Sequence, residues 1–199
     1  MSDAPPWRWK ASFVASPWPH LIVDNFLPRA LVEKSNADIK ASTSGFEIEA
    51  RGRAQIEYSL LRSEALWKAI YSRRTIHLLS SAFAGVVALN RENWIQLRRM
   101  NSQTPEFPRH HDFVRNEDSI ASFLYLSEQW TQENGGRLHL FMDGDYTSPT
   151  ISIAPIQNRF VAFQTKACHW HSVEKVNGWE RLSVLALWNF TPANAALSP

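Results

Sequence analysis

Pro108-Arg109-His110-His111-Asp112 is the stretch that decides how this chain folds and what chemistry it can carry. Side chains two apart on a strand point to the same face, so in an extended segment His110 and Asp112 project together while His111 points away. Two imidazoles and one carboxylate can hold iron(II) on one face of an octahedron and leave the opposite face open. This stretch supplies two of those three groups. The pattern therefore predicts a metal site that a distant histidine on a neighbouring strand completes.

Two residues are candidates for the missing third ligand. His169 and His171 are also two apart, so on a strand they would share one face. Alternation alone does not choose between them.

The sequence around these histidines has the pattern of a β-rich core. After Asn90 the chain breaks into short segments rich in β-branched and aromatic residues, with turn residues between them. Asn134-Gly135-Gly136 predicts a hairpin. The expected strands are Trp94–Met100, Ser119–Leu126, Arg137–Phe141, Thr150–Ala154, Arg159–Gln164, His169–Val173 and Arg181–Phe190.

The first ninety residues read differently. Residues 1–19 are expected to form an irregular, proline-rich lead-in, followed by the elements that close this paragraph. Helices followed by strands in meander spacing indicate an α+β, mostly β fold: a double-stranded β-helix (jelly roll) with N-terminal helices packed on one sheet. The expected elements are strands at 20–26, 46–50 and 54–60, and helices at 28–40, after the N-cap Ser63, and at 75–87.

Length and composition limit the domain organisation, the partners and the localisation. A chain of 199 residues that is 44% apolar suits a single domain over 1–199, with N-terminal strands and support helices in 1–90 and a jelly-roll catalytic core in 91–192. The net charge of +2 is scattered, which argues against nucleic acid as a partner. No apolar run approaches the roughly 20 residues that span a bilayer, so no membrane partner is expected. One cysteine, Cys168, and no secretory apolar core favour a cytoplasmic protein, while the oligomeric state stays open.

From about Trp94 to Phe190 the chain resembles the prolyl-4-hydroxylase-like group of 2-oxoglutarate- and iron(II)-dependent dioxygenases, of the small bacterial type. The entry segment Pro17-Trp18-Pro19-His20 is similar as well, although less specifically. The matching motifs are His110-x-Asp112, Phe123-Leu124-Tyr125-Leu126, Trp130, Glu133-Asn134-Gly135-Gly136-Arg137-Leu138-His139-Leu140, Ile153-Ala154-Pro155, Asn158-Arg159-Phe160-Val161-Ala162-Phe163, Trp170-His171-Ser172-Val173 and Glu180-Arg181-Leu182-Ser183.

The resemblance implies a role for five of these residues. His110, Asp112 and His171 would hold the metal, Arg181 would bind the distal carboxylate of 2-oxoglutarate, and Tyr125 would support that carboxylate. A planar guanidinium suits this task because it grips a carboxylate with two parallel hydrogen bonds and keeps its charge when buried. The sequence departs from the family pattern at Leu185, where relatives often carry a polar residue.

The implied cofactors are Fe(II), 2-oxoglutarate as co-substrate and O2. The implied reaction hydroxylates a C–H bond of a small-molecule or peptidyl substrate and releases succinate and CO2. Side chains expected at the mouth of the barrel, where substrate would be selected, are Arg98, Arg115, Trp130 and Trp170, together with Met100 and Trp188.

Other interpretations compete for the same histidines. A cupin-like metal-binding protein or isomerase without oxygen activation would use His169 and His171, but the glycine expected six residues earlier is Phe163. A zinc hydrolase on His110, His111, Asp112 and His171 has no convincing general base. We expect His111 and His169 to point outward or to support the ligands, His77 and His139 to be structural, and Cys168 to be a small buried side chain.

Overall fold

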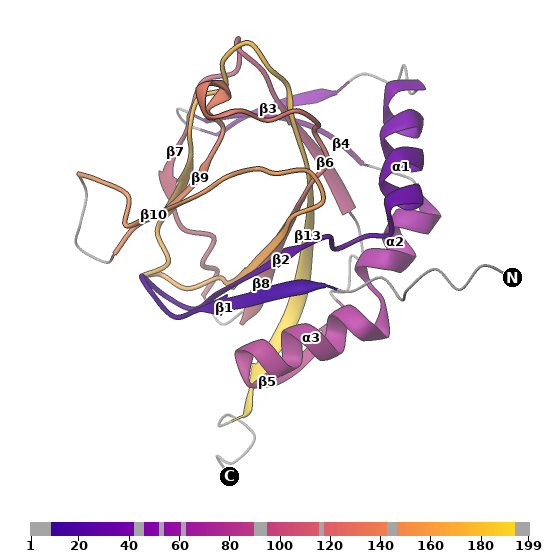
Figure 1. The fold of residues 1–199 in the computed structure, drawn as a ribbon. Helices are drawn as coiled ribbons and strands as arrows, with labels where there is room; N and C mark the ends of the chain where they lie inside the picture. The colour runs from indigo at the N-terminus through magenta and orange to yellow at the C-terminus, as the bar shows by residue number, and fades with distance from the viewer. Residues whose placement is uncertain are drawn as a thin grey trace, which may run out of the picture.

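The computed structural model describes residues 9–41, 46–51, 54–60, 63–89, 95–115, 118–142 and 147–193. Two antiparallel sheets face each other, and the helices cover the outer face of the larger one (Figure 1). The larger sheet runs β1 (Lys10–Val14), β2 (His20–Asp24), β11 (Phe160–Gln164), β8 (Ser119–Tyr125), β13 (Arg181–Pro192), β6 (Ile95–Met100), β4 (Ala54–Leu60) and β3 (Glu47–Arg51), with β5 (Gly85–Leu89) paired to the end of β13. The smaller sheet runs β10 (Ile151–Ile153), β9 (Leu138–Leu140), β12 (His171–Val173) and β7 (Phe107–His110).

Strand alternation divides the core into two clusters, one on each face of the larger sheet. On β8, Ile120 and Leu124 join the helix-side cluster, whereas Phe123 and Tyr125 join the cluster between the two sheets. This division follows from the two-residue period of a strand. The inter-sheet cluster lies beside the strand ends that carry the site residues, so the site is built into a packed interior.

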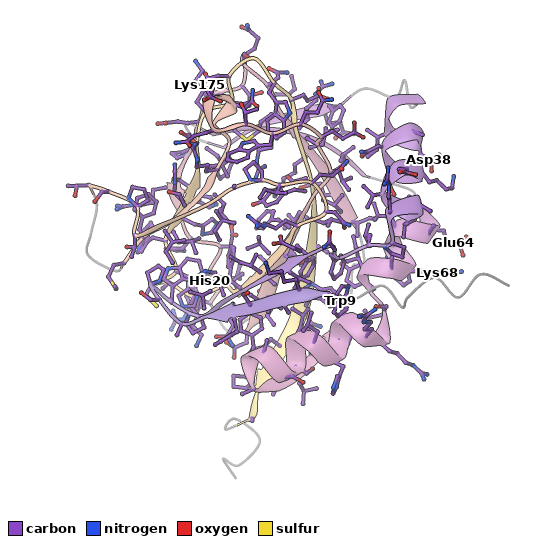
Figure 2. All side chains as sticks on the ribbon, viewed as in Figure 1. Trp9, His20, Asp38, Glu64, Lys68 and Lys175 are labelled. Carbon is purple, nitrogen blue, oxygen red and sulfur yellow. The ribbon has the colours of Figure 1, made fainter. Side chains whose placement is uncertain are left out.

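Three helices complete the helix-side cluster: α1 (Arg29–Ala41), α2 (Glu64–Ile70) and α3 (Arg73–Phe83). Ser63 caps α2 by accepting from the backbone N–H of Leu66 at 3.3 Å, as the sequence predicts. Their outer faces carry charged pairs such as Glu64–Lys68 and Lys34–Asp38, of which Asp38, Glu64 and Lys68 are labelled in Figure 2. No helix in the described part of the chain is long and apolar enough to cross a membrane.

The predicted jelly roll with helices on one sheet is confirmed, but several local predictions are wrong. The lead-in contains β1, which pairs with β2 along its whole length. The helix expected at 75–87 ends at Phe83, where Ala84 turns into the left-handed region at φ 52°, and β5 follows. The shorter strands also begin later than predicted, at Ile151 and His171.

The Gly-Gly segment does not form a hairpin. The strands before and after it, β8 and β9, belong to different sheets, and a short 3-10 helix, η1 (Gln132–Asn134), precedes the glycines. Gly135 and Gly136 have φ of 64° and 71°, a region that glycine enters without steric penalty. Gly135 forms an isolated bridge with Val176, and Gly136 donates to the carbonyl of Lys175 at 3.2 Å. The segment therefore crosses between the sheets and ties the crossing to the approach to β13.

Candidate metal and carboxylate site

Three side chains from two neighbouring strands converge in the smaller sheet. His110 ends β7 and His171 begins β12, and the register places these two residues opposite each other. Asp112 lies two residues beyond the end of β7. Each of the three offers one ligand atom, and these atoms all lie within 4.8 Å of one another. Two imidazoles and one carboxylate at this spacing form a group that could hold a divalent metal ion.

Backbone carbonyls orient both imidazoles toward the centre of this group. His110 Nδ1 lies 2.8 Å from the carbonyl of Pro108, and His171 Nδ1 lies 3.0 Å from the carbonyl of His169. A carbonyl only accepts, so Nδ1 carries the proton in each ring and the Nε2 lone pair is available for a metal. His171 Nε2 is buried and makes no hydrogen bond, although it lies 3.3 Å from Oδ2 of Asp112.

Electrostatics favour the charge states that metal ligands need. Burial, followed by the neighbouring His171, lowers the pKa of His110 to about 4, so this imidazole is neutral at physiological pH. Burial opposes ionisation of Asp112, but contact with His171 and the nearby His110 and Arg98 hold the pKa of this carboxyl well below its ordinary value. The group therefore presents the neutral imidazole of His110 beside an ionised carboxylate.

Arg181 is a buried cation that pairs with no acidic side chain in the part of the chain that the structure describes. Only 4% of this residue is exposed, and it begins β13 beside the inter-sheet cluster. Its Nε donates to the carbonyl of Gly136 at 3.0 Å and its Nη1 donates to Ser183 Oγ at 3.1 Å. The Tyr125 hydroxyl acts favourably on this cation, and no carboxylate of the described residues forms an ion pair with the guanidinium. Burial lowers the pKa of Arg181, which expresses the cost of keeping an uncompensated charge out of water.

Tyr125 lies directly beside this cation. The guanidinium carbon of Arg181 is 4.9 Å from the centre of the Tyr125 ring. The Tyr125 hydroxyl is fully buried and has no hydrogen-bond partner. Burial raises the pKa of Tyr125, while the charge of Arg181 acts in the opposite direction. A buried hydroxyl without a hydrogen-bond partner, beside a buried guanidinium that pairs with no carboxylate of the described residues, is an arrangement that a bound carboxylate would satisfy.

One pocket connects the histidines to Arg181. It opens to solvent, and no acidic side chain of the described residues lines it. The pocket thus pairs basic groups with an apolar wall, which suits an anionic ligand with a carbon chain. The residues that line it are Arg98, Arg99, Met100, Phe107, His110, Phe123, Leu138, His171, Val173, Arg181 and Ser183.

The predicted substrate residues are spread more widely. Arg98 and Met100 line the pocket. Trp170 is half-buried and lies outside the pocket lining, 4.6 Å from His111 between ring centres. Trp130 donates from Nε1 to the carbonyl of Gly135 at 2.8 Å, so it braces the crossing segment.

Two further predicted positions lie away from the pocket. Arg115 is exposed and does not line it. The placement of Trp188 at the barrel mouth is wrong, because this side chain is fully buried in the helix-side cluster and donates to Ser122 Oγ at 3.0 Å.

The neighbouring histidines and the cysteine take other places. His111 packs edge-on against Trp170 and does not join the ligand group. His169 is buried and stacks on Trp18 with ring centres 4.5 Å apart, so the structure brings His171 and not His169 to His110 and Asp112. Cys168 is exposed, which contradicts the expectation of a buried side chain.

Sequence reasoning missed two residues of the pocket lining. Ser183 and Phe123 both line it. Each lies two residues from a predicted site residue on the same strand, Ser183 from Arg181 and Phe123 from Tyr125. Alternation would have placed them on the same face, so the signal was present.

Comparison with known proteins finds similarity in the region that holds the site. Residues 95–189 match the sequence profile of the 2OG-Fe(II) oxygenase superfamily. Prolyl 3-hydroxylase sudestada1 of Drosophila melanogaster is 32% identical over an aligned stretch of 88 residues, which covers 35% of this chain and 16% of that protein. The chain thus spans only a small part of this curated relative.

Solved structures share the fold over most of the chain. A prolyl hydroxylase from Trichoplax adhaerens, in complex with a hypoxia inducible factor oxygen degradation domain peptide fragment, superposes with a TM-score of 0.66 at 20% identity and covers 90% of this chain and 87% of that one. A Pseudomonas putida prolyl-4-hydroxylase gives a TM-score of 0.61 at 20% identity, covering 87% of this chain and 92% of that one. At such identities the likeness establishes the fold.

Proposed function

Because residues 95–189 match the profile of the 2OG-Fe(II) oxygenase superfamily, we propose that the chain uses iron(II), 2-oxoglutarate and O2 to hydroxylate a C–H bond of a small-molecule or peptidyl substrate. The products from the co-substrate are succinate and CO2. His110, Asp112 and His171 hold the iron in this proposal, and Arg181 and Tyr125 bind the distal carboxylate of 2-oxoglutarate.

The unpaired charge of Arg181 is the observation that carries this proposal. A fully desolvated guanidinium without a counter-ion is unfavourable unless a ligand supplies the negative charge. Arg181 lines the same pocket as His110 and His171. A molecule with a carboxylate at one end and a metal-chelating group at the other would satisfy both ends of this pocket, and 2-oxoglutarate is such a molecule.

The chain's own residues supply orientation and exclusion of water. The bound metal and 2-oxoglutarate supply the oxygen-activating chemistry. The carbonyls of Pro108 and His169 fix the imidazole tautomers, and Gly136 and Ser183 fix the guanidinium of Arg181. The apolar wall of Phe107, Phe123, Leu138 and Val173 keeps the carbon chain of the co-substrate away from water.

The substrate class is argued from the pocket and from the names of the relatives. Arg98 and Met100 line the pocket beside the ligand group. The Drosophila relative is a prolyl 3-hydroxylase, and the Trichoplax structure holds a peptide fragment. These names favour a peptidyl substrate, while the pocket itself also accommodates a small molecule.

Binding of co-substrate under anaerobic conditions tests the proposal. Iron(II) with 2-oxoglutarate should give a weak visible metal-to-ligand absorption band, and His171→Ala should lose it. Arg181→Ala should retain iron but bind 2-oxoglutarate more weakly by about 2–5 kcal/mol, because a buried charge pair is broken.

A matched arginine variant controls for general damage. Arg137 is half-buried, in contrast to the buried Arg181; it pairs with Glu174 at 2.9 Å and does not line the pocket. Arg137→Ala should therefore keep the band. Saturating 2-oxoglutarate without any band in the wild-type protein would reject the proposed function.

A further inference from the structure

Trp18, in the entry segment before β2, is almost completely buried next to the smaller sheet. Only 5% of the residue is exposed. Its indole stacks on the imidazole of His169 with an interplanar angle of 14° and ring centres 4.5 Å apart. Its Nε1 donates to the carbonyl of Phe141 at 3.1 Å. The indole therefore has a fixed orientation and presses one face against His169.

His169 passes this constraint to the ligand group through its backbone. Its ring is held from the other direction, since Nδ1 lies 2.6 Å from the carbonyl of Gln164. Its own carbonyl is the group that lies 3.0 Å from His171 Nδ1. The plane and direction of that carbonyl decide where the His171 ring points and which of its nitrogens carries the proton.

A second contact reaches the same imidazole from the side. Trp18 packs edge-on against Phe163, with ring centres 5.2 Å apart. Phe163 in turn packs edge-on against the ring of His171 at 4.9 Å. Trp18 thus supports His171 both through the His169 carbonyl and through the Phe163 ring.

The indole also connects three separate segments. Phe141, which accepts the indole N–H, follows β9, and its own N–H donates to the carbonyl of Trp170 at 3.0 Å. Trp170 is the residue between His169 and His171. The two residues that precede His171 are therefore tied to a side chain that lies about 150 positions earlier in the sequence.

We propose that Trp18 and His169 are positioning residues for the metal site: their stack fixes the backbone carbonyl that orients His171. The proposal rests on the proposed function, since it takes His171 as a metal ligand. Groups that orient a ligating histidine usually change metal affinity 10- to 100-fold when they are removed, even though they never touch the metal. It also gives a role to the Pro17-Trp18-Pro19-His20 segment, which the carboxylate pocket does not use.

Cobalt(II) binding by the intact chain tests this directly, because it needs neither substrate nor turnover. Trp18→Leu should weaken Co(II) binding by about 10-fold or more. Trp18→Phe keeps an aromatic face for His169 and should stay within about threefold of the wild type. In the Co(II) protein, the Nδ1–H resonance of His171 should exchange faster with solvent in Trp18→Leu, whereas that of His110, bonded to Pro108, should not change.

Trp9 provides a matched control. It also stacks on a ring, that of Phe26 at 5.3 Å, and its Nε1 also donates to a backbone carbonyl, that of Phe26 at 2.7 Å. It lies on the helix side, where the guanidinium carbon of Arg74 in α3 is 3.9 Å from the centre of its ring; Trp9 is labelled in Figure 2. Trp9→Leu should therefore leave Co(II) affinity unchanged.

Three results would overturn the inference. Equal Co(II) affinity in Trp18→Leu and wild type would show that the stack does not position His171. Equal losses in Trp18→Leu and Trp9→Leu would show a general packing effect. Failure of the wild-type protein itself to bind Co(II) would remove the proposed ligand set, and this outcome is distinct from a difference between variants.

Discussion

At the scale of single residues, the Tyr125 hydroxyl is expected to lower the stability of the ligand-free protein and to strengthen binding of 2-oxoglutarate. A buried hydroxyl without a partner costs about 1–3 kcal/mol, and the Tyr125 hydroxyl has none. Tyr125→Phe should therefore raise the free energy of unfolding of the ligand-free protein by about 1 kcal/mol. The same change should weaken 2-oxoglutarate binding about 10-fold, since a hydrogen bond to a charged group is lost.

Urea denaturation and 2-oxoglutarate titration of the same two proteins measure these opposite effects. A variant that is less stable than wild type without ligand would show that the hydroxyl contributes to the fold. Unchanged 2-oxoglutarate affinity would remove Tyr125 from the carboxylate site.

The sequence predicted the residues of the candidate metal site, but it did not predict the side chains that pack behind them. Alternation placed His110 and Asp112 on one face but left His169 and His171 open, and the family resemblance then implied His171 and Arg181. The stack of Trp18 on His169 could not be predicted, because it depends on β2 pairing with β11 and so on a long-range register. Trp188 was misplaced for the same kind of reason: an indole in an apolar strand suits a pocket and a core equally well.

At the scale of elements, the crossing segment between β8 and β9 depends on glycine. A side chain at Gly135 would have to adopt φ 64° and would also clash with the carbonyl of Lys175. At Gly178, φ is 58° and nothing lies within 4 Å of the added carbon. Gly178→Ala should therefore cost only the left-handed penalty of about 1–2 kcal/mol. Gly135→Ala should cost more, as urea denaturation of both variants can show.

Binding of 2-oxoglutarate provides a second measurement for the comparison of the two alanine variants. Gly136, the next residue, accepts from Arg181 Nε, so displacement of the segment should also weaken 2-oxoglutarate binding in Gly135→Ala. Equal stability of the two alanine variants would mean that the segment yields to the added carbon and that the Lys175 carbonyl does not hold it.

Central strands were predictable because burial on both faces leaves a strong apolar signal. β8, β11 and β13 all lie in the interior of the larger sheet and were recognised. β1 was missed because nearly all of its residues are exposed at a sheet edge. The first residues of β5 were included in a predicted helix, since Val86 continues the helical spacing and Gly85, directly after the break at Ala84, was not taken as a stop signal. The Asn-Gly-Gly signal predicted a hairpin from local sequence alone. Which strands the turn connects depends on the arrangement of the two sheets, and here β8 and β9 belong to different sheets.

At the scale of the whole molecule, buried His20 makes stability depend on pH. Its Nδ1 lies 2.9 Å from the carbonyl of Trp18, and its Nε2 is buried without a partner (Figure 2). Burial lowers the pKa of His20 from its ordinary value of 6.5, although the bond to Trp18 opposes this effect. Below that value the unfolded chain takes up a proton that the folded chain refuses, so stability is fully present above it and declines as the pH falls.

Replacement by asparagine isolates this contribution. His20→Asn keeps a donor for the Trp18 carbonyl but cannot titrate. The free energy of unfolding, measured by urea denaturation on either side of the ordinary histidine pKa, should fall less on acidification in this variant than in the wild type. Identical pH dependence in the two proteins would show that His20 is protonated as readily in the folded state as in the unfolded state.

The larger sheet separates the two core clusters, so on a central strand the residues with even numbers face one cluster and those with odd numbers face the other. On β13 the even positions Val184, Ala186 and Trp188 face the helices. The odd positions Arg181, Ser183 and Leu185 face the pocket or the inter-sheet cluster. A mutant library restricted to odd positions would therefore explore ligand preference while it leaves the helix-bearing scaffold unaltered, and one restricted to even positions would tune robustness at constant specificity.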